Sequence, residues 1–341
     1  MPEYRPQRML VTGGAGFIGS NFIRHMLTHD ADVHIVNLDK LTYAGSLDHL
    51  KHLPEAHRHT FVEGDICDGD LVARLLREHE VDTIVHFAAE SHVDNSISGP
   101  AVFIETNVTG TFTLLEAARR YWLEEQGWEA KDCRFHHIST DEVYGTLGAD
   151  DPAFSETTAY APNSPYSASK AGSDHLARAW FHTYGLPVTI TNCSNNYGPY
   201  QHGEKLIPTV IRSCAEGRAI PVYGNGSNIR DWLYVGDHCR GVDAVLRNGP
   251  PGSVYNIGGD NEWSNIDVVR LICRVMDESI PQGAPHERLI SFVQDRPGHD
   301  WRYAIDAGKM WHDLCWKPLE SFESGIRKTV AWYLEMWKGE P

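Results

Sequence analysis

The feature that most constrains this chain is a glycine-rich turn between a short apolar run and a helix-like stretch. Residues 9–11 (MLV) are apolar, 12–19 (TGGAGFIG) contain the spacing GxGxxG, and 20–29 (SNFIRHMLTH) have the pattern of a helix. Glycines at these places permit a tight turn, so a pyrophosphate can bind the N–H groups at the start of the helix. Because strand, turn and helix follow in that order, the segment predicts a dinucleotide-binding unit.

A carboxylate at the end of the next strand indicates which dinucleotide is bound. Residues 33–39 (VHIVNLD) read as a second strand that ends in Asp39, twenty positions beyond Gly19. A carboxylate there can accept hydrogen bonds from both ribose hydroxyls and repels a 2′-phosphate. The sequence therefore favours NAD over NADP, although the neighbouring Lys40 weakens that preference.

Strands and helices continue to alternate along the chain. Further strands are expected at 61–66, 83–90 and 133–140, and a sixth strand is expected to end at Asn195 and Asn196. The helices expected between them cover 71–80 and a segment from about Asn107 to 125. Such alternation predicts an α/β fold, a Rossmann-type doubly wound parallel sheet. Beyond Tyr200, short apolar runs alternate with Pro and Gly, which predicts a smaller, mixed α/β C-terminal substrate domain.

Five polar side chains form the candidate catalytic group. Strand 133–140 would deliver Thr140, Asp141 and Glu142 at its carboxyl end, the edge where open α/β sheets bind ligands. Tyr166 and Lys170 are four residues apart, and so share one face of a helix.

The charge of Lys170 should change the acidity of Tyr166. An ammonium about 4 Å from a phenolate is worth roughly 4 kcal/mol, so we expect Lys170 to lower the pKa of Tyr166 by up to about three units. Tyr166 could then accept a proton from a sugar hydroxyl. Taken alone, a Tyr-x-x-x-Lys pair is usually a half-buried aromatic ring beside a solvated lysine, and an Asp-Glu pair is usually a solvated turn. The dinucleotide-binding turn in the same chain favours the catalytic interpretation.

The amino-acid composition limits which binding partners and which cellular compartment are expected. A formal charge of −16 argues against a surface that binds nucleic acid or an anionic membrane. Seven scattered cysteines without a CxxC pair indicate reduced thiols rather than disulfides or a zinc site. The first residues, MPEYRPQRMLVTGG, predict neither a signal peptide nor a membrane anchor. We therefore expect a cytoplasmic protein without a bound metal.

Twelve segments, spread over almost the whole chain, are distinctive: TGGAGFIGS, DKLTYAG, GDI, AAESHVD, HISTDEVYG, YSASK, NCSNNYGPY, EKLIP, IRDWLYV, YNIGG, RPGHDWRYAID and FESGIRKTVAWYL. Together these motifs resemble those of one family, the dTDP-glucose 4,6-dehydratases of the extended short-chain dehydrogenase/reductase superfamily. The TDEVYG motif separates this family from epimerases of the superfamily, which generally lack the Asp-Glu pair.

The resemblance implies a role for each residue of the candidate catalytic group. Tyr166 would be the base for the C4 hydroxyl of the sugar, Lys170 would lower its pKa, and Thr140 would hydrogen-bond the same hydroxyl. Glu142 would remove the C5 proton, and Asp141 would protonate the C6 hydroxyl as it leaves. Oxidation at C4 makes the C5 proton acidic, and the hydride held by NAD then returns to C6.

The resemblance also implies binding residues. NAD contacts would come from Gly13, Gly16, Phe17, Ile18, Gly19, Asp39, Lys40, Thr42, Asp65, Ile66, Ala88, Ala89, Thr106, Tyr166, Lys170 and Asn196. Contacts to the nucleotide-sugar substrate would come from Ser91, Thr140, Asn195, Lys205, Pro221, Tyr223, Arg230, Asn265, Arg296 and His299. We expect residues 1–194, with 232–257 returning to them, to form the NAD-binding domain and 195–341 mainly to bind the nucleotide sugar. The family is generally dimeric, so a homodimer is expected.

Three other functions remain open from the sequence. A UDP-glucose 4,6-dehydratase remains open because Gln201-His202-Gly203 and Ser227-Asn228 depart from the family's usual pattern and are expected near the nucleotide pocket. A UDP-hexose 4-epimerase or decarboxylase would share the fold, but the intact Asp141-Glu142 pair counts against it. A non-catalytic NAD-binding regulator would be expected to lack Tyr166, Lys170 or the acids, and all of them are present.

Overall fold

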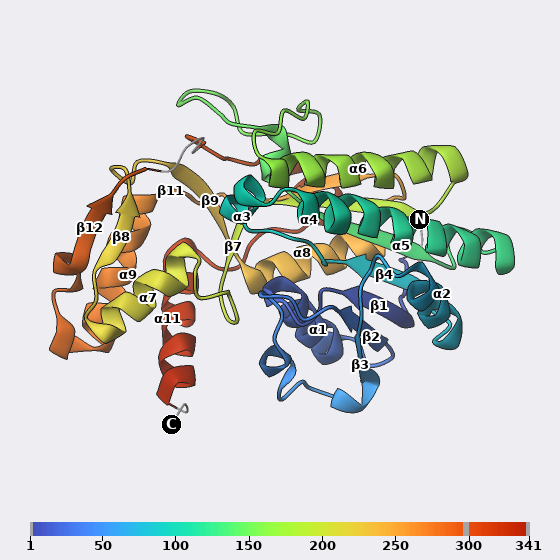
Figure 1. Ribbon diagram of the computed structural model, residues 1–341, viewed down its shortest axis with the longest axis horizontal. Helices are drawn as coiled ribbons and strands as arrows, with labels where there is room; N and C mark the ends of the chain where they lie inside the picture. Colours follow the sequence, from blue (N-terminus) through green and yellow to red (C-terminus); the bar gives the residue numbers. More distant parts are fainter. Residues whose placement is uncertain (1–2, 296–299, 339–341) are drawn as a thin grey trace.

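A seven-stranded parallel sheet forms the larger part of the protein in a computed structural model that describes residues 3–295 and 300–338 (Figure 1). The order of its strands is β10-β6-β5-β4-β1-β2-β3. The strands are β1 (Arg8–Thr12), β2 (His34–Asp39), β3 (His59–Glu63), β4 (Thr83–His86), β5 (Arg134–Thr140), β6 (Val188–Cys193) and β10 (Val254–Ile257). The chain reverses direction across the sheet between β1 and β4, where such folds bind ligands. The predicted fold class is confirmed.

Helices cover both faces of this sheet. On one face α1 (Phe17–His29) contacts α8 (Val235–Asn248), and on the other α2 (Gly69–Glu78), α5 (Thr111–Ala118) and α6 (Pro165–Tyr184) lie together. Met9 and Val11 belong to the first apolar core, whereas Leu10 belongs to the second. This alternation follows from the pleat of a strand, in which successive side chains point to opposite faces.

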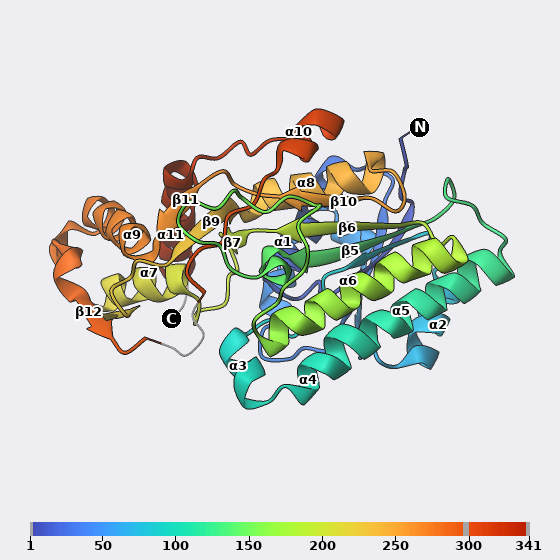
Figure 2. The same cartoon turned by 90° about the horizontal axis from the view of Figure 1, so that it is seen from above.

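One long helical stretch runs beside α6 (Figure 2). It passes through α4 (Ala101–Phe103), a π-helical turn η3 (Ile104–Gly110), α5 and a second π-helical stretch η4 (Arg119–Glu125), and it follows α3 (Val93–Ser98). The sequence predicted its end near residue 125, but the helix starts at Ala101, before the predicted Asn107.

The smaller part of the protein has two short sheets. One has the order β11 (Glu262–Ser264), β9 (Ile229–Tyr234), β7 (Asn195–Tyr197), and the other pairs β12 (Ile290–Val293) with β8 (Ile220–Tyr223). The helices α7 (Leu206–Glu216), α9 (Asn265–Ser279) and α11 (Phe322–Lys338) share one apolar core with these strands. After β9 the chain returns through α8 and β10 to the large sheet, and α10 (Gly308–Leu314) lies against β10.

Short 3-10 helices occupy several connections. They are η1 (Leu47–Leu50), η2 (Ala56–Arg58), η5 (Asp141–Tyr144), η6 (Pro281–Gly283) and η7 (His286–Leu289). None of the helices in the described part of the chain combines the length and the apolar character needed to cross a membrane.

Besides β4, which is Thr83–His86 rather than the expected 83–90, two strand boundaries differ from the prediction. The sixth strand ends at Cys193 rather than at Asn195 and Asn196, because residues 195–197 form β7 and pair with β9 in the other sheet. The third strand is His59–Glu63 rather than 61–66, since Asp65 caps a turn there by accepting a hydrogen bond from the Cys67 N–H at 2.9 Å. In both places a tertiary or turn contact ends an apolar run that the sequence pattern would continue.

Candidate active site

A large cleft of about 1060 Å³ lies along the carboxyl ends of the parallel strands. It is lined by Asp39 at the end of β2, Thr140 at the end of β5 and Cys193 at the end of β6, and by Arg230 from β9 of the smaller part. Residues from both parts of the protein therefore meet in one cleft at the edge where a doubly wound sheet binds its ligands.

The glycine turn between β1 and α1 forms one end of the cleft. A Cβ on Gly13, whose φ is 73°, would lie 2.6 Å from the backbone nitrogen of Ala88, and one on Gly19 would lie 2.3 Å from the Gly13 carbonyl oxygen. Gly16 caps α1 without a side-chain acceptor for the first N–H groups of the helix. A close backbone approach and uncapped N–H groups at a helix start are what a pyrophosphate requires, so these residues fit NAD.

Asp39 holds the turn in place from the end of β2. Its two carboxylate oxygens accept hydrogen bonds from the N–H groups of Ala15 at 2.8 Å and Leu41 at 2.9 Å. The neighbouring Lys40 forms an ion pair with Asp65 at 2.6 Å. Because Asp65 engages this cation, Lys40 does little to weaken the preference for NAD that a carboxylate at position 39 indicates.

Asp141 and Glu142 lie directly after β5, in the 3-10 turn η5. Thr140 begins this turn: its hydroxyl oxygen accepts from the Glu142 N–H at 3.3 Å and donates to Asp141 at 3.3 Å. The other oxygen of Asp141, Oδ2, is buried and meets no hydrogen-bonding group in the described part of the chain. Burial first, and then the nearby Glu142 and Asp231, hold the pKa of Asp141 well above its usual range. A raised pKa favours the protonated form of Asp141, which is the form that can donate a proton.

The first turn of α6 places Tyr166 opposite these acids. Ser164 caps the helix in a reciprocal pair of hydrogen bonds with Ser167, and Pro165 is its first residue, a sequence typical of a helix start. The Tyr166 ring packs edge-on against Phe103 with ring centres 6.3 Å apart.

The pKa of Tyr166 shifts in the direction opposite to the prediction. Burial first, and then the charge of Glu142, raise this pKa well above its usual value, while a hydrogen bond with Thr140 acts against them. Burial also lowers the pKa of Lys170, whose Nζ donates to the Ile138 carbonyl oxygen at 2.7 Å. The loss of water around both groups outweighs the attraction that the Tyr-x-x-x-Lys spacing predicts.

Every predicted binding residue that the structure describes lines this cleft. The predicted NAD contacts there are Gly13, Gly16, Phe17, Ile18, Gly19, Asp39, Lys40, Thr42, Asp65, Ile66, Ala88, Ala89, Thr106, Tyr166, Lys170 and Asn196. The predicted substrate contacts there are Ser91, Thr140, Asn195, Lys205, Pro221, Tyr223, Arg230 and Asn265. The remaining two, Arg296 and His299, lie outside the described residues.

Several contacts hold Arg230, which lines the part of the cleft formed by β9. Its guanidinium lies 4.3 Å from the centre of the Tyr303 ring and donates to the carbonyl oxygens of Ile229 at 2.7 Å and Asp300 at 3.0 Å. A buried guanidinium that is already oriented suits the recognition of phosphate oxygens.

Sequence reasoning missed several residues of the cleft. Tyr43, Glu90 and His92 line it, and each lies inside a motif that was recognised without a role for that residue. Tyr303 also lines the cleft, and it lies in the motif RPGHDWRYAID, which was recognised without a role for this residue. Asp174, behind the cleft, follows Lys170 by four residues on α6, so its helical spacing could have pointed to it.

A glycine turn at a doubly wound sheet, together with a Tyr-x-x-x-Lys pair in the cleft, defines a dinucleotide-dependent enzyme of the short-chain dehydrogenase/reductase class. A model of the family GDP-mannose 4,6 dehydratase matches residues 10–329. The dTDP-glucose 4,6-dehydratase 1 of Escherichia coli (strain K12) is 57% identical over 339 residues, which cover 97% of this chain and 94% of that protein. The chain belongs to this family of nucleotide-sugar 4,6-dehydratases.

Solved structures agree with this assignment. The crystal structure of dTDP-glucose 4,6-dehydratase from Bacillus anthracis in complex with NAD has a TM-score of 0.86 and 45% identity, and the match covers 98% of both chains. A UDP-glucose 4-epimerase from Thermotoga maritima, solved with UDP-glucose, has a TM-score of 0.84 but only 25% identity, with 97% of this chain and 99% of that chain covered. The fold is shared with epimerases, whereas the sequence is much closer to the dehydratases.

Proposed function

We propose that the protein is an NAD-dependent hydro-lyase that converts dTDP-glucose to dTDP-4-keto-6-deoxyglucose. The observation that carries the proposal is the position of Asp141 and Glu142 beside Tyr166 in a cleft that also contains the glycine turn. Removal of water needs an acid and a base of different pKa, and a buried, protonated Asp141 next to the less buried Glu142 provides that pair.

Each residue of the catalytic group has one proton to hold or move. Tyr166, hydrogen-bonded to Thr140, accepts the proton of the C4 hydroxyl in its phenolate form, and the charge of Lys170 stabilises that phenolate before the transfer. Glu142 then removes the C5 proton, which has become acidic beside a C4 ketone. Asp141 donates its proton to the departing C6 hydroxyl. When bound, NAD supplies a reversible store for the hydride that leaves C4 and arrives at C6.

The binding residues divide between the two parts of the protein. Residues 1–194 together with 232–257 form the NAD-binding domain in this proposal, and 195–341 mainly bind the nucleotide sugar. Asp39 and the glycine turn hold the cofactor, and Lys205 and Arg230 supply positive charge for the diphosphate of the substrate. Arg296 and His299 are assigned to the substrate from the family resemblance.

Mass spectrometry tests the reaction and also which nucleobase the substrate carries. The purified protein, incubated separately with dTDP-glucose and UDP-glucose, should remove water from the first much faster than from the second. With dTDP-glucose deuterated at C4, the label should appear at C6 of the product within the same molecule. Faster reaction of UDP-glucose would favour the alternative UDP-sugar dehydratase, and a product of unchanged mass with inverted C4 would favour an epimerase.

We also propose that the protein is a cytoplasmic homodimer. Ile104 in η3, Phe112 in α5 and Tyr184 in α6 are large, exposed apolar residues on neighbouring helices. Ring contacts connect Phe112 to Trp180 and Trp180 to Tyr184 across α5 and α6. Covering such a face with the same face of a second copy would bury it in an isologous interface.

A further inference from the structure

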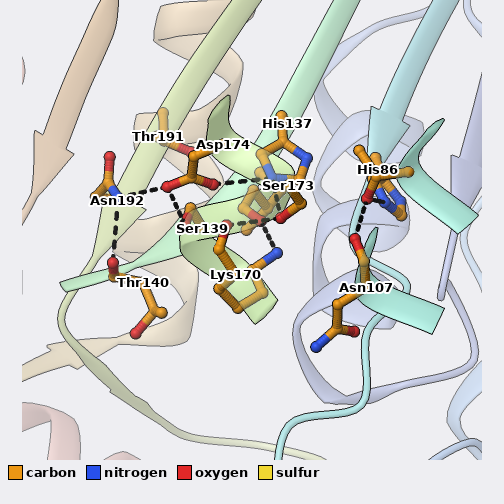
Figure 3. A network of polar contacts seen from close by, with 12 residues as sticks. His86, Asn107, His137, Ser139, Thr140, Lys170, Ser173, Asp174, Thr191 and Asn192 are labelled. Carbon is orange, nitrogen blue, oxygen red and sulfur yellow. Dashed lines mark hydrogen bonds and ion pairs between the residues drawn. The ribbon is translucent and has the colours of Figure 1, made fainter. Parts of the chain in front are cut away.

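A buried carboxylate on α6 joins four segments of the chain behind the catalytic group. Asp174, only 2% exposed, accepts hydrogen bonds from Ser139 Oγ at 2.8 Å, Tyr160 Oη at 2.9 Å and His137 Nε2 at 3.1 Å. Asn192 Nδ2 is a fourth donor at 3.4 Å. Figure 3 shows Asp174 between His137 and Asn192, with Lys170 nearby. The proposed mechanism gives none of these contacts a role.

Asp174 hydrogen-bonds His137 and Ser139, the two neighbours in β5 of the residue that Lys170 contacts. Lys170 Nζ donates to the carbonyl oxygen of Ile138 at 2.7 Å, and His137 and Ser139 are the residues on either side of Ile138 in β5. Asp174 also lies one helical turn beyond Lys170 on α6. One carboxylate therefore fixes the helix that carries Lys170 against the strand that receives its hydrogen bond.

The same network reaches the start of the acidic turn. Asn192 Nδ2, which donates to Asp174, also donates to the carbonyl oxygen of Thr140 at 3.1 Å. Thr140 caps η5 and hydrogen-bonds Tyr166. A displacement of Asp174 would therefore shift the position of Thr140 as well as that of Lys170.

Asp174 is also placed to neutralise the charge of Lys170. Lys170 is 5% exposed, and a buried charge is costly unless an opposite charge accompanies it. Burial lowers the pKa of Lys170, and the charge of Asp174 is the first influence that opposes this shift.

Burial disfavours the charged forms of the other titratable groups around the pair. Burial lowers the pKa values of His86 and His137 and raises those of Tyr144, Tyr160 and Cys193. His137 Nδ1 is buried without a hydrogen-bonding partner in the described part of the chain, as expected for a neutral ring whose proton is on Nε2. These surrounding groups are His86 on β4, His137 on β5, Tyr144 in η5, Tyr160 before α6 and Cys193 on β6.

We propose that Asp174 is a positioning residue for the reaction, the buried counter-charge that keeps Lys170 protonated and holds it against β5. The proposal rests on the roles proposed above for Tyr166 and Lys170. Asp174 contacts neither substrate nor cofactor in this proposal. The carboxylate acts through Lys170 and through the hydrogen bonds of Asn192, which connect it to Thr140.

The pH dependence of turnover separates this role from a merely structural one. Asp174→Asn keeps the shape of the side chain but removes its charge, so Lys170 should lose its proton at lower pH. We expect the high-pH limb of the kcat profile to move down by about one unit or more, as for loss of an adjacent opposite charge. The KM for dTDP-glucose should change less than about threefold, since no substrate contact is lost.

Asp243→Asn is the matched control for this variant. Asp243 is also a helical carboxylate paired with a histidine, His25 at 3.4 Å, and it does not line the cleft. Its variant should keep the parent profile. An Asp174→Asn protein that folds and also keeps the parent high-pH limb would overturn the proposal.

A thermal unfolding cycle tests the charge pair without any turnover. Lys170→Met leaves Asp174 as a buried carboxylate without its counter-charge, so it should unfold at a lower temperature than the parent at pH 8. Adding Asp174→Asn to Lys170→Met should raise the unfolding temperature again, although Asp174→Asn alone lowers it. A double variant that unfolds at the same or a lower temperature than Lys170→Met would overturn the pairing, and this comparison does not require that Asp174→Asn alone folds.

The two measurements also separate the proposals. If the unmutated protein does not dehydrate dTDP-glucose, the proposed function fails while the unfolding cycle still decides whether Asp174 and Lys170 are coupled.

Discussion

At the scale of single residues, two neighbouring carboxylic acids meet different surroundings. Asp141 is 2% exposed and has one oxygen without a partner in the described part of the chain, whereas Glu142 is less buried and faces the cleft. The pKa of Asp141 is raised chiefly by burial. In the proposed mechanism, the division of labour between acid and base therefore comes from how deeply each side chain is buried rather than from its chemical type.

We predict that Asp141→Asn slows turnover by about 10² to 10⁴, the usual contribution of a general acid. Because burial favours the neutral form of Asp141, replacing its carboxyl group with a neutral amide should cost little stability. Stopped-flow absorbance with dTDP-glucose should show reduced cofactor accumulating in this variant and not in Tyr166→Phe, which cannot oxidise C4. Asp70→Asn, exposed in the first turn of α2, is the control and should behave as the parent. Turnover of Asp141→Asn within threefold of the parent would contradict the assignment.

At the scale of elements, the β1–turn–α1 unit depends on contacts between backbones. The space beside Gly19 is filled by the carbonyl oxygen of Gly13 at 2.3 Å and the Cα of Gly14 at 2.8 Å from where a Cβ would lie. Backbone atoms cannot move aside as a flexible side chain can. The start of α1, the proposed pyrophosphate site, is therefore positioned by the absence of side chains in the turn.

We predict that Gly19→Ala lowers the free energy of unfolding by roughly 1–3 kcal/mol, as overpacking does, and weakens NAD binding in calorimetry. Gly69→Ala is the matched control, because its Cβ would meet Thr113 Cγ2 at an ordinary 3.6 Å. That variant should bind NAD normally and be unchanged or more stable by up to about 1 kcal/mol. Equal NAD affinity and stability in both variants would show that the turn tolerates a methyl group.

At the scale of the whole molecule, the face formed by α5 and α6 should hold two copies together. We predict that Phe112→Arg, at a ring that is 44% exposed, gives a monomer in sedimentation at micromolar concentration. A guanidinium there would have to be buried without a partner in the dimer. Trp311→Arg on α10, at a ring that is 50% exposed, should leave the dimer intact. A Phe112→Arg protein that still sediments as a dimer would place the interface elsewhere.

Histidines buried in the large sheet and its helices should make the protein sensitive to acid. Burial lowers the pKa values of His86, His136 and His137, and that of His238 to about 3. Below their unfolded pKa of about 6.5, the unfolded chain binds protons that the folded chain does not. Stability should therefore fall as the pH drops below about 6.5, by up to roughly 1.4 kcal/mol per pH unit for each histidine.

His238→Leu tests this whole-molecule effect. Neither ring nitrogen of His238 has a hydrogen-bonding partner in the described part of the chain, so the substitution loses no polar contact. Urea unfolding between pH 7 and pH 5 should show a shallower loss of stability in the variant. An identical slope in the parent and the variant would mean that His238 is protonated in the folded state.

Features that depend on neighbours in the sequence could be predicted from the sequence. The glycine turn, Asp39 after β2 and the Thr140–Glu142 turn each belong to a strand–turn–helix unit, whose geometry follows from a few adjacent residues. For the same reason the order of strands and helices, and with it the fold class, could be predicted. The spacing of Tyr166 and Lys170 likewise placed both on one helical face.

Burial and contacts between distant segments were decided only by the tertiary structure. The pKa of Tyr166 rises because water is excluded from around it, which no spacing reveals. The sixth strand ends at Cys193 because residues 195–197 find a partner in β9, more than thirty positions away in the sequence. Asp174 gathers donors from residues 137, 139, 160 and 192 only after β5, β6 and α6 have packed together. A sequence pattern describes one element at a time, whereas burial and these contacts arise from several elements at once.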